Sequence, residues 1–150
     1  AFQEGKTPSE IVYQQVGSSI FQQGQKDPLH LEKGLNYKYF EGSFSQTSEI
    51  EQVQALRLGV TSGISIKEIK ADENFAMVFE GYLNVLKEGL YTFYLESNDG
   101  SILILNDHKL IDNDGAHGVH TKSASTSLRR GFHKLKVKYF QKGGGKALKV

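Results

Sequence analysis

Two short stretches of this chain gather side-chain oxygens between strand-like runs. Asn98-Asp99-Gly100-Ser101 lies between residues 89–97 and 102–107, and Asp112-Asn113-Asp114-Gly115 follows shortly afterwards. Carboxylate and amide oxygens are ligands that Ca²⁺ prefers, and they also accept hydrogen bonds from hydroxyl groups. Two such loops beside adjacent hairpin strands predict a calcium or sugar-hydroxyl site on a β-scaffold.

Both stretches also have the composition of tight turns. Asn and Asp tolerate the left-handed backbone region, and Gly takes a positive φ without strain, so a hydrated turn is the alternative interpretation of each stretch. An EF-hand is excluded: with Gly115 at its sixth position, the first and twelfth positions would be Leu110 and Thr121, which are not suitable ligands.

Two other binding motifs fail on their spacing. His117 and His120 would lie on opposite faces of an extended segment, which argues against zinc. The run Gly143-Gly144-Gly145-Lys146 resembles a phosphate loop, but Phe140 and Ala147 stand where that motif needs Gly and Ser or Thr. We expect this run to be a flexible hairpin turn.

A catalytic carboxylate pair is the remaining chemistry to consider, for example Asp99 with Asp112 or Asp114. Glycoside hydrolysis needs two carboxyls about 5–9.5 Å apart, one of them with a raised pKa. These candidates lie in polar, Gly-rich loops that favour ionised side chains, and no Gly-x-Ser-x-Gly elbow is present. The sequence therefore predicts a non-catalytic chain. Aromatic rings that stack on sugars are another route to glycan binding, with candidates Tyr37, Tyr39, Tyr82 and Tyr94.

Composition narrows the possible partners and compartments. The chain has 150 residues, 18 basic and 17 acidic, and a net charge of +1, which gives no reason to expect nucleic acid or an anionic membrane as partner. There is no cysteine, and no apolar run approaches the ~20 residues of a membrane helix. We expect an extracellular, periplasmic or cell-surface fragment of a larger protein, without a signal peptide at residue 1.

Alternating apolar residues predict an all-β chain. Residues 1–33 are polar and are expected to be a linker or the tail of a preceding domain. Residues 34–150 are expected to form an antiparallel β-sandwich or barrel, because many short strands are separated by turns. Expected strands cover residues 36–41, 75–85, 89–97, 102–105, 110–111, 119–128, 133–139 and 146–150, with a short one through Ile64, Ile66 and Ile69.

The order of these pieces resembles the PA14 domain, the β-sandwich module named after the anthrax protective antigen. The resemblance covers 34–150 and rests on segments 34–42, 79–83, 89–101, 112–118 and 131–140. It implies a non-catalytic, often carbohydrate-binding module of secreted bacterial glycoside hydrolases, toxins and yeast adhesins. Residues 28–35 resemble the joint before such modules in hexosaminidase-like or fucosidase-like hydrolases. The implied partners are a glycan and the catalytic domain of the same parent chain. The alternative is a structural spacer without a ligand.

The resemblance also implies a site. In the adhesin branch, two consecutive Asp residues, often joined by a cis peptide bond, bind the Ca²⁺ that chelates sugar hydroxyls. Here the pair is Asn98 and Asp99, so it carries one formal charge instead of two. The predicted calcium ligands are these two residues, and the predicted glycan site adds Asp112, Asp114 and His117. We expect Asp99→Ala to abolish calcium-dependent glycan retention while leaving melting without calcium nearly unchanged.

Overall fold

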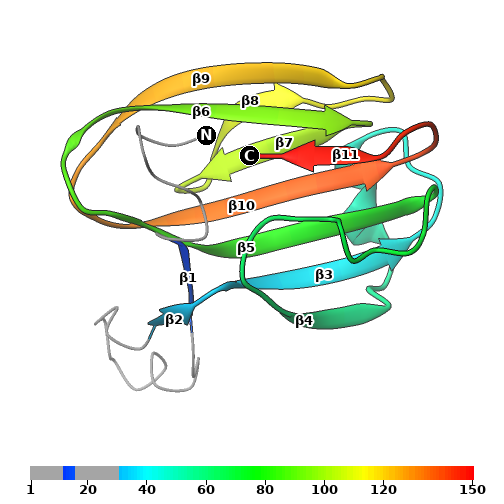
Figure 1. The fold of residues 1–150 in the computed structure, drawn as a ribbon, viewed down its shortest axis with the longest axis horizontal. Helices are drawn as coiled ribbons and strands as arrows, with labels where there is room; N and C mark the ends of the chain where they lie inside the picture. Colours follow the sequence, from blue (N-terminus) through cyan, green and yellow to red (C-terminus); the bar gives the residue numbers. More distant parts are fainter. Residues whose placement is uncertain (1–11, 16–30) are drawn as a thin grey trace.

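The computed structural model describes residues 12–15 and 31–150, and the side chains from residue 34 onward. It is an antiparallel sandwich of two sheets, as the sequence predicted (Figure 1). The larger sheet has the strand order β2 (Leu31–Lys33), β1 (Val12–Gln15), β5 (Phe75–Val85), β10 (Gly131–Gln141), β7 (Ser101–Leu105) and β8 (His108–Asn113), and β3 (Leu35–Glu41) and β4 (Arg57–Thr61) extend it beside β5. The smaller sheet has the order β11 (Ala147–Lys149), β6 (Gly89–Asn98) and β9 (His120–Leu128).

The main core lies between the two sheets, because successive side chains of a strand point to opposite faces. On β6, for example, Tyr91, Phe93 and Leu95 are buried in this core, while the residues between them are partly or fully exposed. Strands β5 and β10 pair along their full lengths at the centre of the larger sheet. This central pair fixes the position of the loops at both of its ends.

A second apolar cluster covers the outer face of the larger sheet. Its members are Phe40, Phe44, Ile50, Ala76, Val78 and Phe140. The segment after β3 closes over it and contains the 3-10 helix η1 (Thr47–Gln52). Glu51 of this helix forms ion pairs with Lys136 and Lys138 of β10, at 3.1 and 3.4 Å. The outer face of β10 is therefore partly covered and held by charge as well as by apolar contact.

Several local expectations change in the structure. The prediction of a strand through Ile64, Ile66 and Ile69 is wrong: these residues form an irregular segment that packs its isoleucines onto the core. The strand in this region is instead β4, whose Leu58 and Val60 are exposed, so its sequence lacks the buried half of the usual alternation. Strands β1 and β2 lie within the range 1–33 that was expected to be a linker, and they add to the larger sheet. The remainder of that range lies outside the described residues.

Within the part of the chain that the structure describes, no helix has the length and apolar character needed to span a bilayer.

Candidate functional site

Three connections meet at one end of the sandwich, on the right in Figure 1. They join β6 to β7 (residues 98–101), β8 to β9 (residues 113–119) and β10 to β11 (residues 142–146). We call these three connections the loop cluster. The sequence predicted that the first two meet, and the third was interpreted as a flexible hairpin turn.

The Asp99 carboxylate is the centre of the loop cluster. Its Oδ1 accepts a hydrogen bond from the backbone N–H of His117 at 3.0 Å, and its Oδ2 accepts bonds from the N–H groups of Lys142 at 2.7 Å and Gly143 at 3.1 Å. Asp99 is only 6% exposed. Because hydrogen bonds to an ionised acceptor are stronger than neutral ones, one carboxylate fixes all three connections relative to each other.

Asn98 is buried next to the Asp99 carboxylate but takes no part in the hydrogen bonds of that carboxylate. Its side chain is 8% exposed and lies beside Gly144 of the third connection. Among the side chains that the structure describes, its Oδ1 is the one buried polar atom without a hydrogen-bond partner. The Asn98–Asp99 peptide bond is cis, the feature that the resemblance associated with the adhesin branch.

The backbone of this turn is tied to β10. The Tyr139 hydroxyl donates to the Asn98 carbonyl at 2.7 Å, and the Phe140 N–H donates to the Gly100 carbonyl at 3.0 Å. Burial raises the pKa of Tyr139 well above its usual range, and the nearby Asp99 carboxylate raises it further. Tyr139 is therefore a neutral donor at neutral pH.

Gly100 allows the first two connections to approach each other. A Cβ at this position would lie 2.4 Å from the Phe140 ring and 2.7 Å from the Gly115 carbonyl oxygen. Since atoms do not approach so closely, only glycine allows this contact.

The third connection joins β10 of the larger sheet to β11 of the smaller sheet, which do not pair with each other, so the expectation of a hairpin turn is wrong. The Gln141 amide donates to the carbonyls of Gly144 at 3.0 Å and Asp72 at 3.1 Å. The Lys146 ammonium donates to the carbonyls of Ile69 and Ala71. Sequence reasoning missed this connection because it contributes backbone N–H groups, which no residue type reveals. The one available signal was the glycine run itself, which allows a backbone to come close to a partner.

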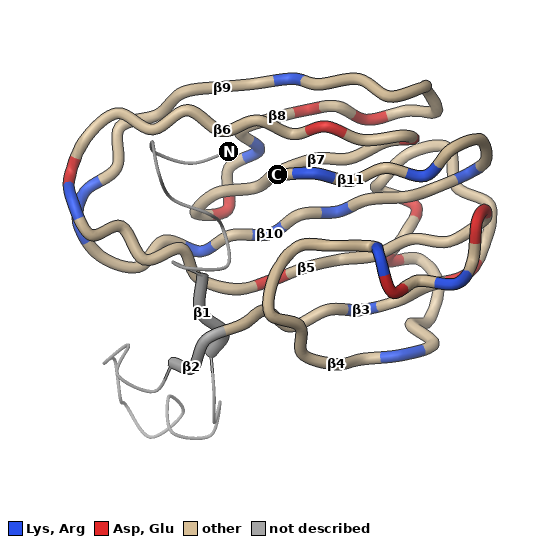
Figure 2. Tube along the Cα trace, viewed as in Figure 1, with Lys and Arg blue, Asp and Glu red and all other residues tan. Residues whose placement is uncertain are grey.

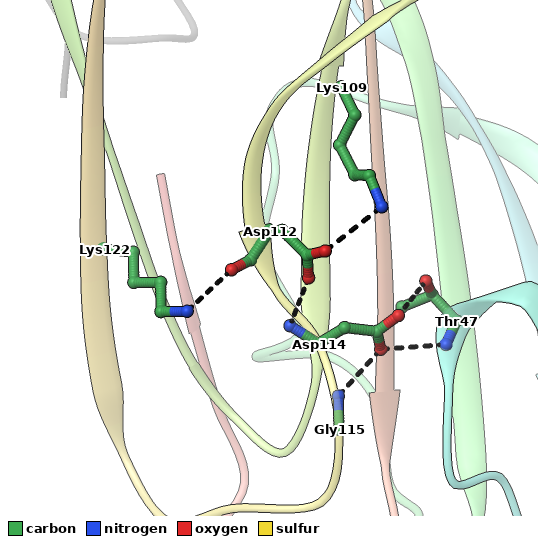
Figure 3. Close-up of polar contacts among 6 residues, drawn as sticks. All are labelled: Thr47, Lys109, Asp112, Asp114, Gly115 and Lys122. Carbon is green, nitrogen blue, oxygen red and sulfur yellow. Dashed lines mark hydrogen bonds and ion pairs between the residues drawn. The ribbon is translucent and has the colours of Figure 1, made fainter.

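The carboxylates of Asp112 and Asp114 bind partners outside the group of N–H donors that surrounds Asp99 (Figure 3). Asp114 accepts bonds from the Thr47 N–H at 2.9 Å and the Thr47 hydroxyl at 2.8 Å, which connects the second loop to η1. Asp112 accepts from the Lys109 ammonium at 3.1 Å and from the Asp114 N–H at 3.1 Å. These two bonds, with Lys109 the larger cause, lower the pKa of Asp112. The two loops thus meet through the Asp99 carboxylate and the His117 N–H, and the carboxylates of the second loop are bound elsewhere.

His117 is placed at the loop cluster by its backbone rather than by its ring. Its ring nitrogens contact the carbonyls of Gly118 at 2.6 Å and Asn113 at 2.8 Å. The expectation that His117 and His120 face opposite sides is wrong, because their ring centroids are 6.0 Å apart. His117 precedes β9, so strand alternation does not apply to it. Even so, the described residues contain no group of three His, Cys, Asp or Glu side chains that would hold a metal ion.

An open depression of about 480 Å³ borders the second connection on the outer face of the larger sheet. Asp112, Asp114, Gly115 and Lys138 line it, with Ile102 as an apolar part of the lining. Neither Asn98 nor Asp99 lines this depression. The two predicted carboxylates therefore belong to a surface that is separate from the buried centre of the loop cluster.

Comparison with known proteins agrees with this architecture. Residues 31–150 match the PA14 domain. The PA14 domain of the MpAFP antifreeze protein superposes with a TM-score of 0.63 at 15% identity, covering 77% of this chain and 78% of that one. A PA14 sugar-binding domain from an RTX adhesin gives a TM-score of 0.57 at 16% identity, covering 77% of this chain and 86% of that one. No curated protein sequence matches this chain.

An enzyme contains the same fold as one part of a longer chain. A β-glucosidase from Kluyveromyces marxianus matches with a TM-score of 0.56 at 17% identity, covering 77% of this chain and only 17% of the enzyme. The fold and the sequence match together place the protein among non-catalytic β-sandwich modules. The chain belongs to the PA14 domain family, which is associated with sugar binding in adhesins and glycosidases.

Proposed function

We propose that this domain is a glycan-binding accessory module of a larger secreted bacterial glycoside hydrolase, with a hexosaminidase-like or fucosidase-like parent. It would act outside the cytoplasm, where such hydrolases meet their substrates. One observation carries the proposal: the loop cluster is rigidly assembled around Asp99, yet the Asn98 oxygen beside it has no protein partner. A buried polar atom without a partner is costly, so its retention favours a ligand that supplies one.

The residues present fit a weakly held calcium ion. Asn98 Oδ1 is without a partner, and Asp99 Oδ1 accepts a single hydrogen bond and retains a lone pair. These are the two oxygens that would hold the ion, together with loop carbonyls. The protein supplies one negative charge here, and calcium affinity depends on the number of charged ligands. Bound there, calcium would take sugar hydroxyls as further ligands.

The remaining residues have supporting roles in this proposal. Asp99 sets the spacing of the connections through its other oxygen, which accepts two N–H groups. Tyr139 and Gly100 fix the turn that presents Asn98. The exposed edge of the cluster includes the small residues Ala116 and Gly144.

The second candidate function is a structural spacer that has no ligand of its own. The low exposure of Asn98 and Asp99, 8% and 6%, favours it, because a buried pair presents little surface to a sugar. In that case the carboxylate serves only to join three connections. The two functions differ in their response to added calcium and in glycan retention.

Calorimetry with calcium, followed by a glycan array in calcium and in chelator, tests the proposal. We expect wild type to bind calcium in the millimolar range. Asn98→Asp should bind it at least about tenfold more tightly, since it doubles the ligand charge. Asn98→Ala should lose calcium binding while keeping its fold, because the removed oxygen has no protein partner. If neither wild type nor Asn98→Asp binds calcium or any glycan, the spacer function replaces the proposed one.

A further inference from the structure

The outer face of the smaller sheet carries a regular pattern of residues that the packing of the core between the two sheets does not require. Directly opposed residues of an antiparallel pair place their side chains on the same face. Since alternate residues of β6 are buried, the residues between them point outward, and those from Leu90 to Glu96 each stand opposite a hydroxyl residue of β9. The pairs are Leu90 with Ser127, Thr92 with Ser125, Tyr94 with Ser123, and Glu96 with Thr121.

This face combines hydroxyl groups with exposed apolar surface. Tyr94 is 47% and Leu90 is 68% exposed. The hydroxyls of Thr92 and Ser125 hydrogen-bond each other at 2.8 Å. Beside these residues stand Ser123 and Ser127, which are also exposed. We call the outward residues 90, 92, 94, 123, 125 and 127 the hydroxyl face.

The residues of the hydroxyl face carry no charge, and charge is confined to its end, where Glu96 stands opposite Lys149 of β11. Strand β9 contains one charged residue, Lys122, which appears as the single blue segment along it in Figure 2. Lys122 stands opposite the buried Leu95, so its side chain leaves β9 on the side away from the hydroxyl face. Its ammonium donates to the Asp112 carbonyl of β8 at 2.9 Å. Strand β6 has only Glu96, at the end of the face, where it accepts a bond from the Thr121 hydroxyl. A neutral, hydroxyl-bearing ligand suits such a surface better than an ionic one.

The hydroxyl face leads to the loop cluster. Asn98 follows Tyr94 and Glu96 at intervals of two along β6, so it belongs to the same side of the strand. Asn98 lies four residue steps along the strand from Tyr94, a distance of about 13 Å at ~3.3 Å per residue. A single sugar held at Asn98 does not reach Tyr94, whereas a chain of several sugars does.

We propose that the hydroxyl face binds a linear, neutral, β-1,4-linked glycan whose end is held at the loop cluster. The Tyr94 ring would stack on the apolar face of one sugar ring, and the row of Ser and Thr hydroxyls would exchange hydrogen bonds with sugar hydroxyls along the chain. Because β-1,4-linked chains are flat ribbons, a sheet face fits them. This inference rests on the proposed glycan function and extends it from one sugar to an oligosaccharide.

Chain length is the variable that tests it. Calorimetry would compare cellohexaose and chitohexaose with glucose and N-acetylglucosamine, in the presence of calcium. We expect one hexasaccharide to bind more tightly than its monosaccharide. Tyr94→Ala should weaken the hexasaccharide by up to about tenfold, the size of one lost aromatic contact, and leave the monosaccharide unchanged. Ser125→Lys, which places a long charged side chain in the middle of the face, should act in the same way.

Leu58→Ala provides a control at an exposed apolar residue outside the hydroxyl face. Leu58 lies on β4 of the other sheet and is 68% exposed, the same as Leu90. Its replacement should leave hexasaccharide affinity at the wild-type value. Circular dichroism of each variant would confirm an intact fold.

The outcomes distinguish a failure of this inference from a failure of the proposed glycan-binding function. If hexasaccharide and monosaccharide bind equally well and Tyr94→Ala changes neither affinity, the hydroxyl face is not a binding surface and the loop site stands alone. If wild type binds none of these sugars, the inference is overturned. If it also binds nothing on the glycan array, the proposed function falls as well.

Discussion

Removing the Asp99 carboxylate should destabilise the domain even in the absence of calcium. The sequence led to the opposite expectation, a metal-free melting temperature nearly unchanged in Asp99→Ala, because it assigned the side chain only to ligand binding. In the structure this carboxylate accepts three backbone N–H groups from two separate connections. Alanine would leave all three donors without an acceptor.

The size of the effect follows from those three bonds. A donor left without a partner costs about 1–3 kcal/mol when it is buried, and these three bonds are only partly buried. Taking about 1 kcal/mol for each gives a loss of about 3 kcal/mol in the free energy of unfolding. For a domain of this size that corresponds to a fall of about 10 °C in melting temperature. Asp99→Asn keeps one acceptor oxygen and should lie between alanine and wild type.

Thermal and urea unfolding in chelator, followed by circular dichroism, would measure these shifts. Asp112→Ala is the control: its carboxylate faces Lys109 at the surface, and exposed ion pairs are worth less than about 1 kcal/mol. The expected order of stability is wild type and Asp112→Ala, then Asp99→Asn, then Asp99→Ala. The reasoning is refuted if Asp99→Ala melts in chelator at the same temperature as Asp112→Ala.

Three further predictions concern the support of the site and its pH dependence. Gly100→Ala should lower the free energy of unfolding by about 1–3 kcal/mol, because its Cβ would clash with Phe140; wild-type urea unfolding would contradict this. Tyr139→Phe should cost about 1–3 kcal/mol, since it leaves the Asn98 carbonyl without its donor. It should also remove, from an alkaline absorbance titration, a tyrosine that ionises at higher pH than an exposed one, as expected from its raised pKa. For Glu51, burial alone would raise the pKa, but the two β10 lysines outweigh burial and lower it. Its contribution is therefore present at neutral pH and lost as the pH falls through its folded pKa. Glu51→Gln should be less stable than wild type at neutral pH by under about 1 kcal/mol, and the difference should shrink as the pH is lowered, as urea unfolding across an acid pH series would show.

The sequence predicted the sandwich because its central strands carry a clear period of two. Tyr91, Phe93 and Leu95 alternate with more exposed residues in β6, and burial follows that alternation. The prediction from sequence failed at the periphery of the sandwich, where burial follows the period of two less closely. Strand β4 exposes both Leu58 and Val60, while three isoleucines with strand-like spacing pack from an irregular segment. An edge strand and an apolar loop look alike when only residue types are known.

The loop cluster was only partly predictable for a different reason. Residue types identified Asn98 and Asp99, but the groups that surround Asp99 are backbone N–H donors, which every residue except proline carries. For the same reason, the acidic residues of the second loop were predicted to belong to the site, whereas in the structure they bind Thr47 and Lys109. Side-chain chemistry shows where charge is available, and only the fold shows which partner uses it.

The two adjacent positions therefore carry different constraints. Position 99 is part of the architecture, because three hydrogen bonds depend on its carboxylate. Position 98 is not, because its oxygen contacts no protein donor. A second carboxylate at position 98 would be buried beside the first without compensation, so Asn98→Asp should melt below wild type in chelator. Calcium would bind the folded variant and reverse the order, by an amount that grows with calcium concentration relative to the dissociation constant. Melting temperatures of wild type and Asn98→Asp would be plotted against calcium concentration. If the two plots cross, Asn98 makes the metal-free domain more stable and its calcium affinity lower. Parallel plots would show that position 98 does not face a cation.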